Sequence, residues 1–201
     1  MLQFSAISFV FLSMPVICSA AGTHMTLRSY YVDLSVSQVD TMPNFIKDKE
    51  EKKHVTIDRR ITCGVHGYST IQHKYVQKEI GTDRVVIDNA TGLMWHQSGS
   101  RKYMKYEKAK EWLGNLNRRG YAGYRDWRLP TGEEAVSLLE SSKNDSGLYI
   151  DTIFSNKQRF IWTGDNSDSK RGWDVNFILS CIYRKEYTND INFVRPVRSM
   201  R

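Results

Sequence analysis

The spacing of apolar and polar residues changes along the chain, and these changes predict where helices and strands lie. One helical face is marked by apolar side chains three and four positions apart: Tyr106, Ala109, Trp112, Leu113 and Leu116. Gly120 follows where helices often end on a left-handed residue. Thr131 and Glu134 have the spacing of a capping box, which predicts a second helix over residues 132–140.

Short apolar stretches separated by turn residues predict β-strands in the rest of the second half. Residues 84–87 and 93–97 flank the turn-forming residues 88–92 and are typical of a hairpin. Four further strands are expected at 160–162, 173–179, 181–187 and 191–197. Two helices with short antiparallel strands predict an α+β fold.

The pattern is weaker before residue 81. Apolar residues between 36 and 46 have near-helical spacing that Pro43 interrupts, and residues 55–61 and 70–76 could form strands. A mixed charge run over 47–53 is typical of a solvated linker. We therefore expect residues 22–80 to be a partly structured segment or a linker.

The first 21 residues carry no charged side chain, and residues 9–17 are almost entirely apolar. Small residues follow, so this stretch is typical of a signal peptide cut after Ala20 or Ala21, although no Lys or Arg precedes it. A lipid anchor at Cys18 is the weaker interpretation because Ile17 is bulky. The run is shorter than the roughly 20 residues that span a bilayer. We expect an exported protein, periplasmic, on the cell surface or secreted, with no transmembrane segment after processing.

Two cysteines, Cys63 and Cys181, remain after the signal peptide. In an oxidising compartment they are expected to form one disulfide, and two separately buried thiols are the alternative. His66 and His73 lie close to Cys63 in sequence, but zinc sites usually have four ligands in tighter pairs. We expect neither a metal ion nor another cofactor.

The chain has 201 residues, of which 40% are hydrophobic and 12% aromatic, and a net charge of +7. A basic surface favours anionic partners such as sulfated glycans, and a purely solubilising surface is an equal alternative. One basic cluster lies before and along the first helix: Arg101, Lys102, Lys105, Lys108 and Lys110. These residues could bind sulfate or carboxylate groups of a glycan, but Glu107 and Glu111 interleave with them, so pairing along a solvated helix face is expected there. No nucleic-acid partner is expected.

Three strings of residues together resemble a known family. Residues 86–95 (VIDNATGLMW), 120–131 (GYAGYRDWRLPT) and 193–198 (FVRPVR) are similar to the opening, central and final blocks of the collagen-like-adhesin C-terminal domain family. The resemblance covers about 115 residues within an expected domain over residues 81–199. No collagen-like repeat precedes that domain, and Lys105 stands where relatives often have a helix-capping Thr.

The resemblance implies a C-type-lectin-like fold, secretion or surface display, and adhesion to anionic polysaccharide or to a protein through long loops. In such a fold a polar loop between Trp162 and Trp173 is the expected ligand position. Its candidate binding residues are Trp162, Asp165, Asn166, Asp168, Lys170, Arg171 and Trp173. A solvated loop anchored in the core is the simpler alternative. Calcium is not expected, because the sugar-binding strings of calcium-dependent lectins are absent.

No catalytic site is expected. Residues 126–131 could be interpreted as an active site, but Trp127 and Leu129 should be buried, and Asp126 and Arg128 could pair or satisfy backbone groups near the core. The family is similar in fold to sulfatase activators, whose chemistry needs two reactive cysteines, and only Cys181 lies inside the domain. A non-enzymatic binding module is therefore the first hypothesis. A sulfatase-activator-like enzyme or a structural subunit of a secreted assembly are the alternatives.

Overall fold

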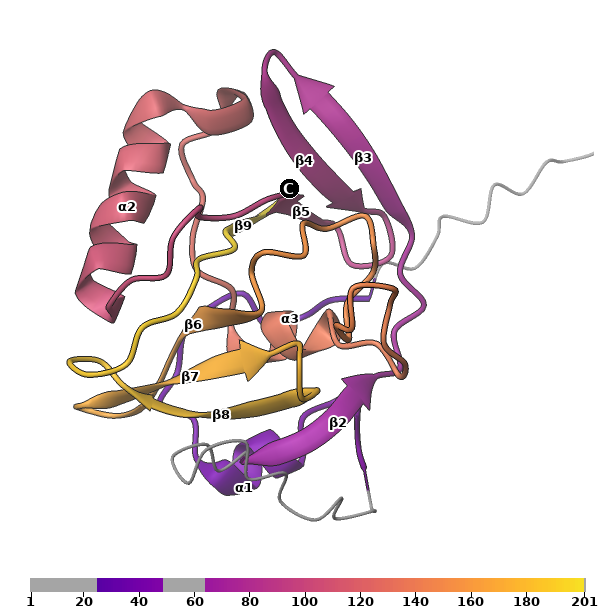
Figure 1. Cartoon of the computed structure of the whole chain (residues 1–201), viewed down its shortest axis with the longest axis vertical. Helices are drawn as coiled ribbons and strands as arrows, with labels where there is room; N and C mark the ends of the chain where they lie inside the picture. Colours follow the sequence, from indigo (N-terminus) through magenta and orange to yellow (C-terminus); the bar gives the residue numbers. More distant parts are fainter. Residues whose placement is uncertain (1–24, 49–63, 201) are drawn as a thin grey trace, which may run out of the picture.

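The computed structural model describes residues 25–48 and 64–200. Two antiparallel sheets and a few helices make an α+β fold, as the apolar pattern predicts (Figure 1). The expected signal peptide, the expected strand at 55–61 and Cys63 lie outside the described residues.

The larger sheet has the strand order β1-β2-β8-β7-β6. Its strands are β1 (Phe45–Lys47), β2 (Val65–Ser69), β6 (Phe160–Asp168), β7 (Arg171–Asn176) and β8 (Cys181–Glu186). The segment between Trp162 and Trp173, expected to be a loop, is instead the end of β6 and the start of β7. Asn166 pairs with Gly172 and Asp168 with Arg171, so the turn itself is only two residues long.

The smaller sheet has the order β3-β4-β5-β9, with β3 (Tyr75–Ile80), β4 (Asp83–Asp88), β5 (Leu93–His96) and β9 (Val197–Ser199). β3 and β4 pair over six residues each, from Tyr75 opposite Asp88 to Ile80 opposite Asp83. The domain start expected at residue 81 therefore falls inside a hairpin. The final strand was expected over residues 191–197. The observed strand, β9, is shorter and begins later in the chain, because residues 192 and 193 make only isolated bridges.

The helices are α1 (Val36–Asp40), α2 (Tyr106–Arg119), the 3-10 turn η1 (Tyr121–Gly123) and α3 (Gly132–Ser137). The capping box of α3 is confirmed: the Thr131 hydroxyl accepts from the Glu134 amide, and the Glu134 carboxylate accepts from the Thr131 amide. α2 ends at Gly120 with φ of 68°, a left-handed conformation that glycine adopts at little cost. Lys105 gives α2 no side-chain cap, as expected.

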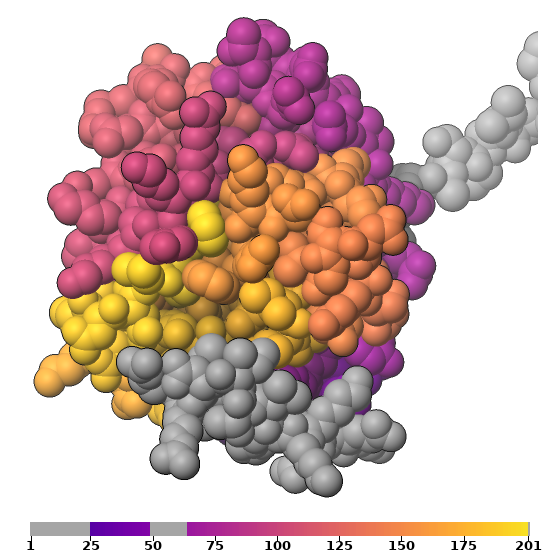
Figure 2. Space-filling view, viewed as in Figure 1, coloured from indigo at the N-terminus to yellow at the C-terminus, as the bar shows by residue number. Residues whose placement is uncertain are grey.

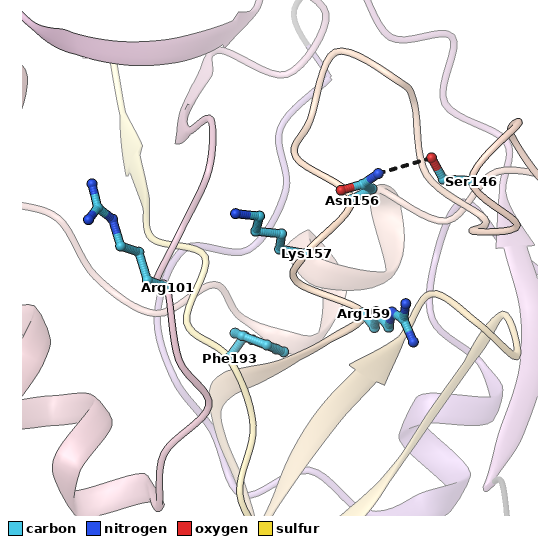
Figure 3. A pocket seen from close by; sticks show the side chains of 6 residues that line it. All are labelled: Arg101, Ser146, Asn156, Lys157, Arg159 and Phe193. Atoms are coloured by element: carbon cyan, nitrogen blue, oxygen red, sulfur yellow. Dashed lines mark hydrogen bonds between the residues drawn. The ribbon is translucent and has the colours of Figure 1, made fainter.

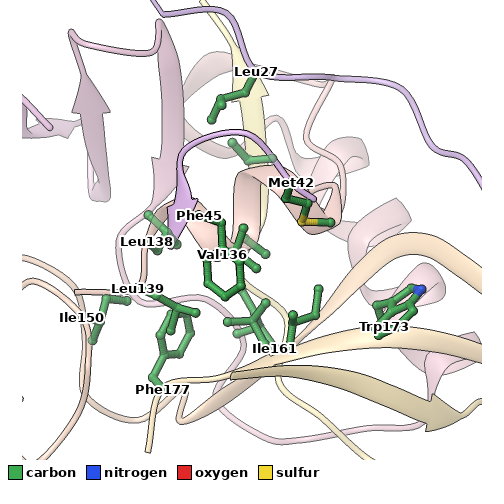
Figure 4. Close-up of a cluster of buried hydrophobic side chains, with 14 of the residues drawn as sticks. Leu27, Met42, Phe45, Val136, Leu138, Leu139, Ile150, Ile161, Trp173 and Phe177 are labelled. Carbon is green, nitrogen blue, oxygen red and sulfur yellow. The ribbon is translucent and has the colours of Figure 1, made fainter. Parts of the chain in front are cut away.

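The main hydrophobic core lies between α3 and the larger sheet (Figure 4). Residues before the family-like region contribute to it, among them Leu27, Leu34, Val39, Met42 and Phe45. Burial of a large apolar side chain stabilises a fold by about 1.5–3 kcal/mol. The described part of the N-terminal segment is therefore built into the core and does not behave as a linker.

Asp165 on β6 links the N-terminal segment to this core through hydrogen bonds. Its buried carboxylate accepts from the Arg28 guanidinium at 2.9 and 2.6 Å and from the backbone amides of Val32 and Gly132 at 2.9 and 2.6 Å. The Tyr31 ring lies directly over Gly164, where any side chain would collide with it. The segment thus covers one end of the β6–β7 hairpin.

Trp127 and Leu129 are 2% and 3% exposed, so the structural role expected for residues 126–131 fits the burial of both. Asp126 and Arg128 do not form a salt bridge with each other, but Arg128 donates to the Leu129 carbonyl at 3.2 Å, which matches the alternative that these side chains satisfy backbone groups. Arg128 forms a salt bridge with Glu134 at 2.6 Å, and Asp126 pairs with Arg198 at 2.8 Å.

Every helix in the described part of the chain is too short or too polar to cross a membrane.

Candidate functional site

The residues expected to form a ligand site between Trp162 and Trp173 are distributed very differently in space. Trp162 and Trp173 are 0% and 1% exposed, and their indole nitrogens donate to the backbone oxygens of Met104 and Leu34. Neither ring therefore offers a face for stacking on a sugar. Their burial matches the alternative interpretation, in which they anchor the hairpin in the core.

Several polar residues of that expected site are also bonded to other residues of the protein. Asp165 is fully buried against Arg28, and Asn166 donates to Asp33 at 3.1 Å. Asp168 and Arg171 form a salt bridge at 2.6 Å at the tip of the hairpin. Lys170 lies exposed beside them. These residues do not converge on one hollow, and their role in ligand binding stays a prediction.

A different group of side chains surrounds a surface hollow of about 330 Å³ (Figure 3). Its walls come from three segments that are distant in sequence: the connection between β5 and α2, the long connection between α3 and β6, and the C-terminal segment before β9. The residues that line it are Arg101, Ser146, Asn156, Lys157, Arg159 and Phe193. Figure 3 shows the Phe193 ring between Arg101 and Arg159. Figure 2 shows the three segments meeting on this face of the molecule.

The three cations of this hollow lie close together and have no acidic partner among the described residues. Arg101, Lys157 and Arg159 are exposed, and within residues 25–48 and 64–200 none of them forms a salt bridge. No Asp or Glu lines the hollow. Positive charge is therefore concentrated there without local compensation.

The lysines of α2 show the contrast. Lys108 pairs with Glu111 at 2.8 Å and Lys110 pairs with Glu107 at 2.7 Å, each with i,i+3 spacing. The pairing expected along the solvated helix face is thus confirmed, and only Arg101 of the basic cluster belongs to the hollow.

Arg195, a fully buried arginine, links two of the segments that form the hollow. Its guanidinium donates to the backbone oxygens of Gln97 at 2.6 Å and Ser155 at 3.1 Å, and to the Gln158 side chain at 3.3 Å. It also lies over the Phe154 ring at 4.8 Å. Burial lowers the pKa of Arg195 to about 9, so the group is still a cation at neutral pH.

Ser100 and Gln158 complete this support. The Gln158 amide donates to the Ser100 carbonyl at 2.7 Å, and both residues are buried. Ser100 and Val194 exchange two hydrogen bonds, from the Ser100 amide at 2.7 Å and to the Ser100 hydroxyl at 3.0 Å. Arg101, Lys157 and Phe193 each neighbour one of these residues in the chain, so the network fixes the backbone that carries them.

This arrangement is suited to binding an anion. Arginine forks match the geometry of carboxylate and sulfate groups, and charge-assisted hydrogen bonds are about twice as strong as neutral ones. The Phe193 ring packs edge-on with Tyr103 at 5.5 Å, and Tyr103 is 55% exposed. An aromatic surface beside three cations can contact both the apolar face and the charged groups of a small acidic ligand.

Sequence reasoning found Arg101 but missed Lys157, Arg159 and Phe193. Part of this site could be recognised from the sequence, because Lys157 and Arg159 stand on either side of a polar residue just before the apolar residues of β6. Nothing in the local pattern shows that residues 101 and 193 lie beside them, since that contact depends on the bridge between Ile161 and Phe193.

The histidines near Cys63 have other partners. His73 lies 2.7 Å from both the Asp88 carboxylate and the Ser137 carbonyl, and His66 lies 3.0 Å from the Leu179 carbonyl. In the described part of the chain no three His, Cys, Asp or Glu side chains are placed to hold a metal ion.

Comparison with known proteins identifies one family. The Lcl C-terminal domain matches residues 84–198, which is more than half of the chain. No curated protein matches the chain.

Proposed function

Because this chain belongs to the Lcl C-terminal domain family, we propose that it is a non-enzymatic binding module of the cell envelope or surface that recognises an acidic glycan. The family supports a surface or adhesin-related domain. The observation that supports the ligand class is the hollow that Arg101, Lys157, Arg159 and Phe193 line without an acidic residue among them.

An acidic sugar fits this hollow in three respects. The volume of about 330 Å³ lies at the lower end of the range for small-ligand pockets and accommodates one sugar residue of a longer chain. A carboxylate or sulfate group would be held by the guanidinium groups, and the Asn156 and Ser146 side chains, which bond each other at 3.1 Å, can exchange hydrogen bonds with hydroxyl groups. The open position of the hollow allows a polymer to continue on either side.

The test replaces the cations while keeping polar side chains. In the triple variant Arg101→Gln, Lys157→Gln, Arg159→Gln, we expect affinity for heparin or polygalacturonate to fall at least 100-fold, because each charge-assisted bond is worth about 1.5–3 kcal/mol. Calorimetric titration at low salt measures the affinity. The wild-type affinity should also fall steeply as salt increases.

The matched control is Lys105→Gln, Lys108→Gln, Lys110→Gln, which removes the same charge from α2. We expect it to change affinity less than threefold, because surface charges away from the ligand are screened. Equal losses in the two variants would show that net charge alone drives binding. Failure of the wild type to bind either polysaccharide would leave a protein partner as the ligand.

Export and the C-type-lectin-like fold belong to the same proposal. A domain that displays a hollow made of long connections is the arrangement that the family resemblance implies. A sulfatase-activator-like enzyme would need a reactive thiol at Cys181, which is 0% exposed at the start of β8. Burial disfavours the thiolate form on which such reactivity depends.

We also propose the disulfide between Cys63 and Cys181. β2 pairs with β8 through Val65 opposite Ile182 and His66 opposite Cys181, so the chain that follows Cys63 runs along β8. With processed protein denatured without reductant, we expect no thiol labelling by maleimide, and two labelled thiols after reduction, as mass spectrometry would report. Two thiols labelled without reduction would contradict the disulfide, and rapid labelling of the native protein would support the enzyme alternative.

A further inference from the structure

A second hollow of about 410 Å³ has the opposite electrostatic character. It lies where the connection between β2 and β3 passes the connection that follows α3. Its lining consists of Tyr68, Ser69, Thr70, Ile71, Gln72, His73, Tyr75, Glu140, Ser141 and Asp151. Lys and Arg are absent from this lining, although the protein carries a net charge of +7.

Two carboxylates give this hollow its charge. Within the described residues neither Glu140 nor Asp151 forms a salt bridge, and the Asp151 carboxylate accepts only one hydrogen bond, from the Ile153 amide at 2.8 Å. Burial raises the pKa of Glu140, and Asp151 raises it further while His73 opposes the shift. The Glu140 carboxylate therefore lacks a compensating cation.

His73 forms its hydrogen bonds elsewhere. Its two ring nitrogens face the Asp88 carboxylate and the Ser137 carbonyl, each at 2.7 Å. Both ring nitrogens therefore have partners other than Glu140 and Asp151. Glu140 and Asp151 remain as the uncompensated charge of the hollow.

The Tyr75 side chain points to a ligand independently of the carboxylates. Its ring stacks on His73 at 4.7 Å and packs edge-on with Phe154 at 5.2 Å. Burial raises the pKa of its hydroxyl well above the usual value, yet within the described residues that hydroxyl has no hydrogen bond. This hydroxyl lines the hollow and is available for a hydrogen bond to a ligand.

We propose that this hollow binds a primary ammonium group, held between the Glu140 and Asp151 carboxylates beside the Tyr75 ring. Carboxylates compensate the charge of the ammonium, and aromatic rings attract organic cations. The hydroxyl and amide groups of Ser69, Gln72 and Ser141 can bond hydroxyl groups on the rest of the ligand. The carrier of the ammonium is an amino sugar or a lysine side chain.

An organic ammonium fits the hollow better than a metal ion. Divalent cations such as calcium take six or more oxygen ligands in a closed shell. In the described part of the chain no three His, Cys, Asp or Glu side chains are close enough to form such a shell. The hollow is also much larger than an ion needs, and its aromatic and hydroxyl groups can contact an organic ligand.

The experiment titrates the full chain with glucosamine, N-acetylglucosamine and Nα-acetyl-lysine amide at low salt, and follows amide chemical shifts by NMR. We expect glucosamine to bind at least tenfold more tightly than N-acetylglucosamine, which has the same ring but no charge. Shifts should centre on residues 68–75 and 140–151. Stronger binding of the lysine amide than of glucosamine would identify a protein side chain as the source. Equal binding of the two hexosamines, or no binding of either amine, would overturn the proposal.

Variants that each remove one negative charge test whether Glu140 and Asp151 form the binding site. Glu140→Gln and Asp151→Asn keep the shape of each side chain, and each should weaken amine binding about tenfold or more. Asp145→Asn is the matched control, because Asp145 is exposed on the same connection, outside the hollow, and loses the same charge. An equal loss in Asp145→Asn would overturn the assignment. The triple variant of Arg101, Lys157 and Arg159 should bind amines as the wild type does, so this proposal and the proposed function can fail separately.

Discussion

Replacing Arg195 by alanine is expected to lower the free energy of unfolding by about 3–5 kcal/mol, the cost of removing one partner from a buried charged network. The guanidinium is fully buried and bridges the Gln97, Ser155 and Gln158 oxygens. In the variant these acceptors lose their donor, and a cavity forms against Phe154. The long connection between α3 and β6 would lose its link to the residues before α2.

Urea denaturation at neutral pH measures this loss. Arg184→Ala is the matched control, because Arg184 lies exposed on β8 and its side chain forms no hydrogen bond or salt bridge with the described residues; we expect a change within about 0.5 kcal/mol. Arg195→Lys should fall between the two, since an ammonium keeps the charge but cannot reach three acceptors in a plane. Equal stability of Arg195→Ala and Arg184→Ala would contradict the role that we assign to Arg195.

The variant Arg195→Lys is also expected to affect ligand binding at the hollow. Under conditions where Arg195→Lys is folded, we expect weaker binding of acidic polysaccharide even though no residue of the hollow has changed. The reason is that Arg195 fixes the backbone of the segments that carry Arg101 and Lys157.

Replacing Asp174 by asparagine is expected to raise the free energy of unfolding at pH 7 by about 2–4 kcal/mol, because the buried carboxyl must either carry an unpaired charge or hold a proton that it would release in water. Asp174 lies on β7 with 0% exposure, and within the described residues both of its carboxylate oxygens lack a hydrogen bond. Asn192 lies nearby with its amide atoms also unpaired. An amide at position 174 has the same shape, carries no charge and can pair with Asn192.

The effect of Asp174→Asn on the free energy of unfolding depends on pH. Burial raises the pKa of Asp174 well above its usual value, so the folded protein holds a proton that the unfolded chain releases. Its contribution is therefore favourable below the unfolded pKa near 3.9, and it is lost as pH rises toward the raised folded value. The gain from Asp174→Asn should be small near pH 4 and should grow with pH.

Thermal or urea unfolding of both proteins between pH 4 and pH 8 tests this. His96 acts in the opposite direction, because burial and the charge of Arg195 lower its pKa to about 3, and its contribution is lost as pH falls below 6.5. That contribution is the same in both proteins, so the difference between them isolates Asp174. A variant that is less stable than the wild type at pH 8 would show that the carboxylate is compensated in the native state.

Much of the local structure could be predicted because it depends on residues close together in the chain. The spacing of Tyr106 to Leu116 gave α2, Gly120 gave its end, and the Thr131 and Glu134 pair gave the start of α3. In each case the hydrogen bonds and the apolar face lie within one or two helical turns.

The polar segment after Trp162 was harder to predict. Its Asp and Asn residues are typical of a loop, yet it continues β6 because the N-terminal segment covers it and Arg28 pairs with Asp165. That pair joins residues 137 positions apart, and no local pattern reports it. The same contact explains why the described N-terminal residues belong to the core.

By itself, the sequence determined the α+β class, the two main helices, the burial of Trp127 and Leu129, and the family, since each depends on local periodicity or on a contiguous motif. Only the tertiary structure decided which charged groups are compensated. Arg28, Asp165, Arg128 and Glu134 neutralise one another, whereas Arg101, Lys157 and Arg159 on one side, and Glu140 and Asp151 on another, are left without partners. The physical reason is that electrostatic compensation depends on distance in space, which the order of residues along the chain does not fix.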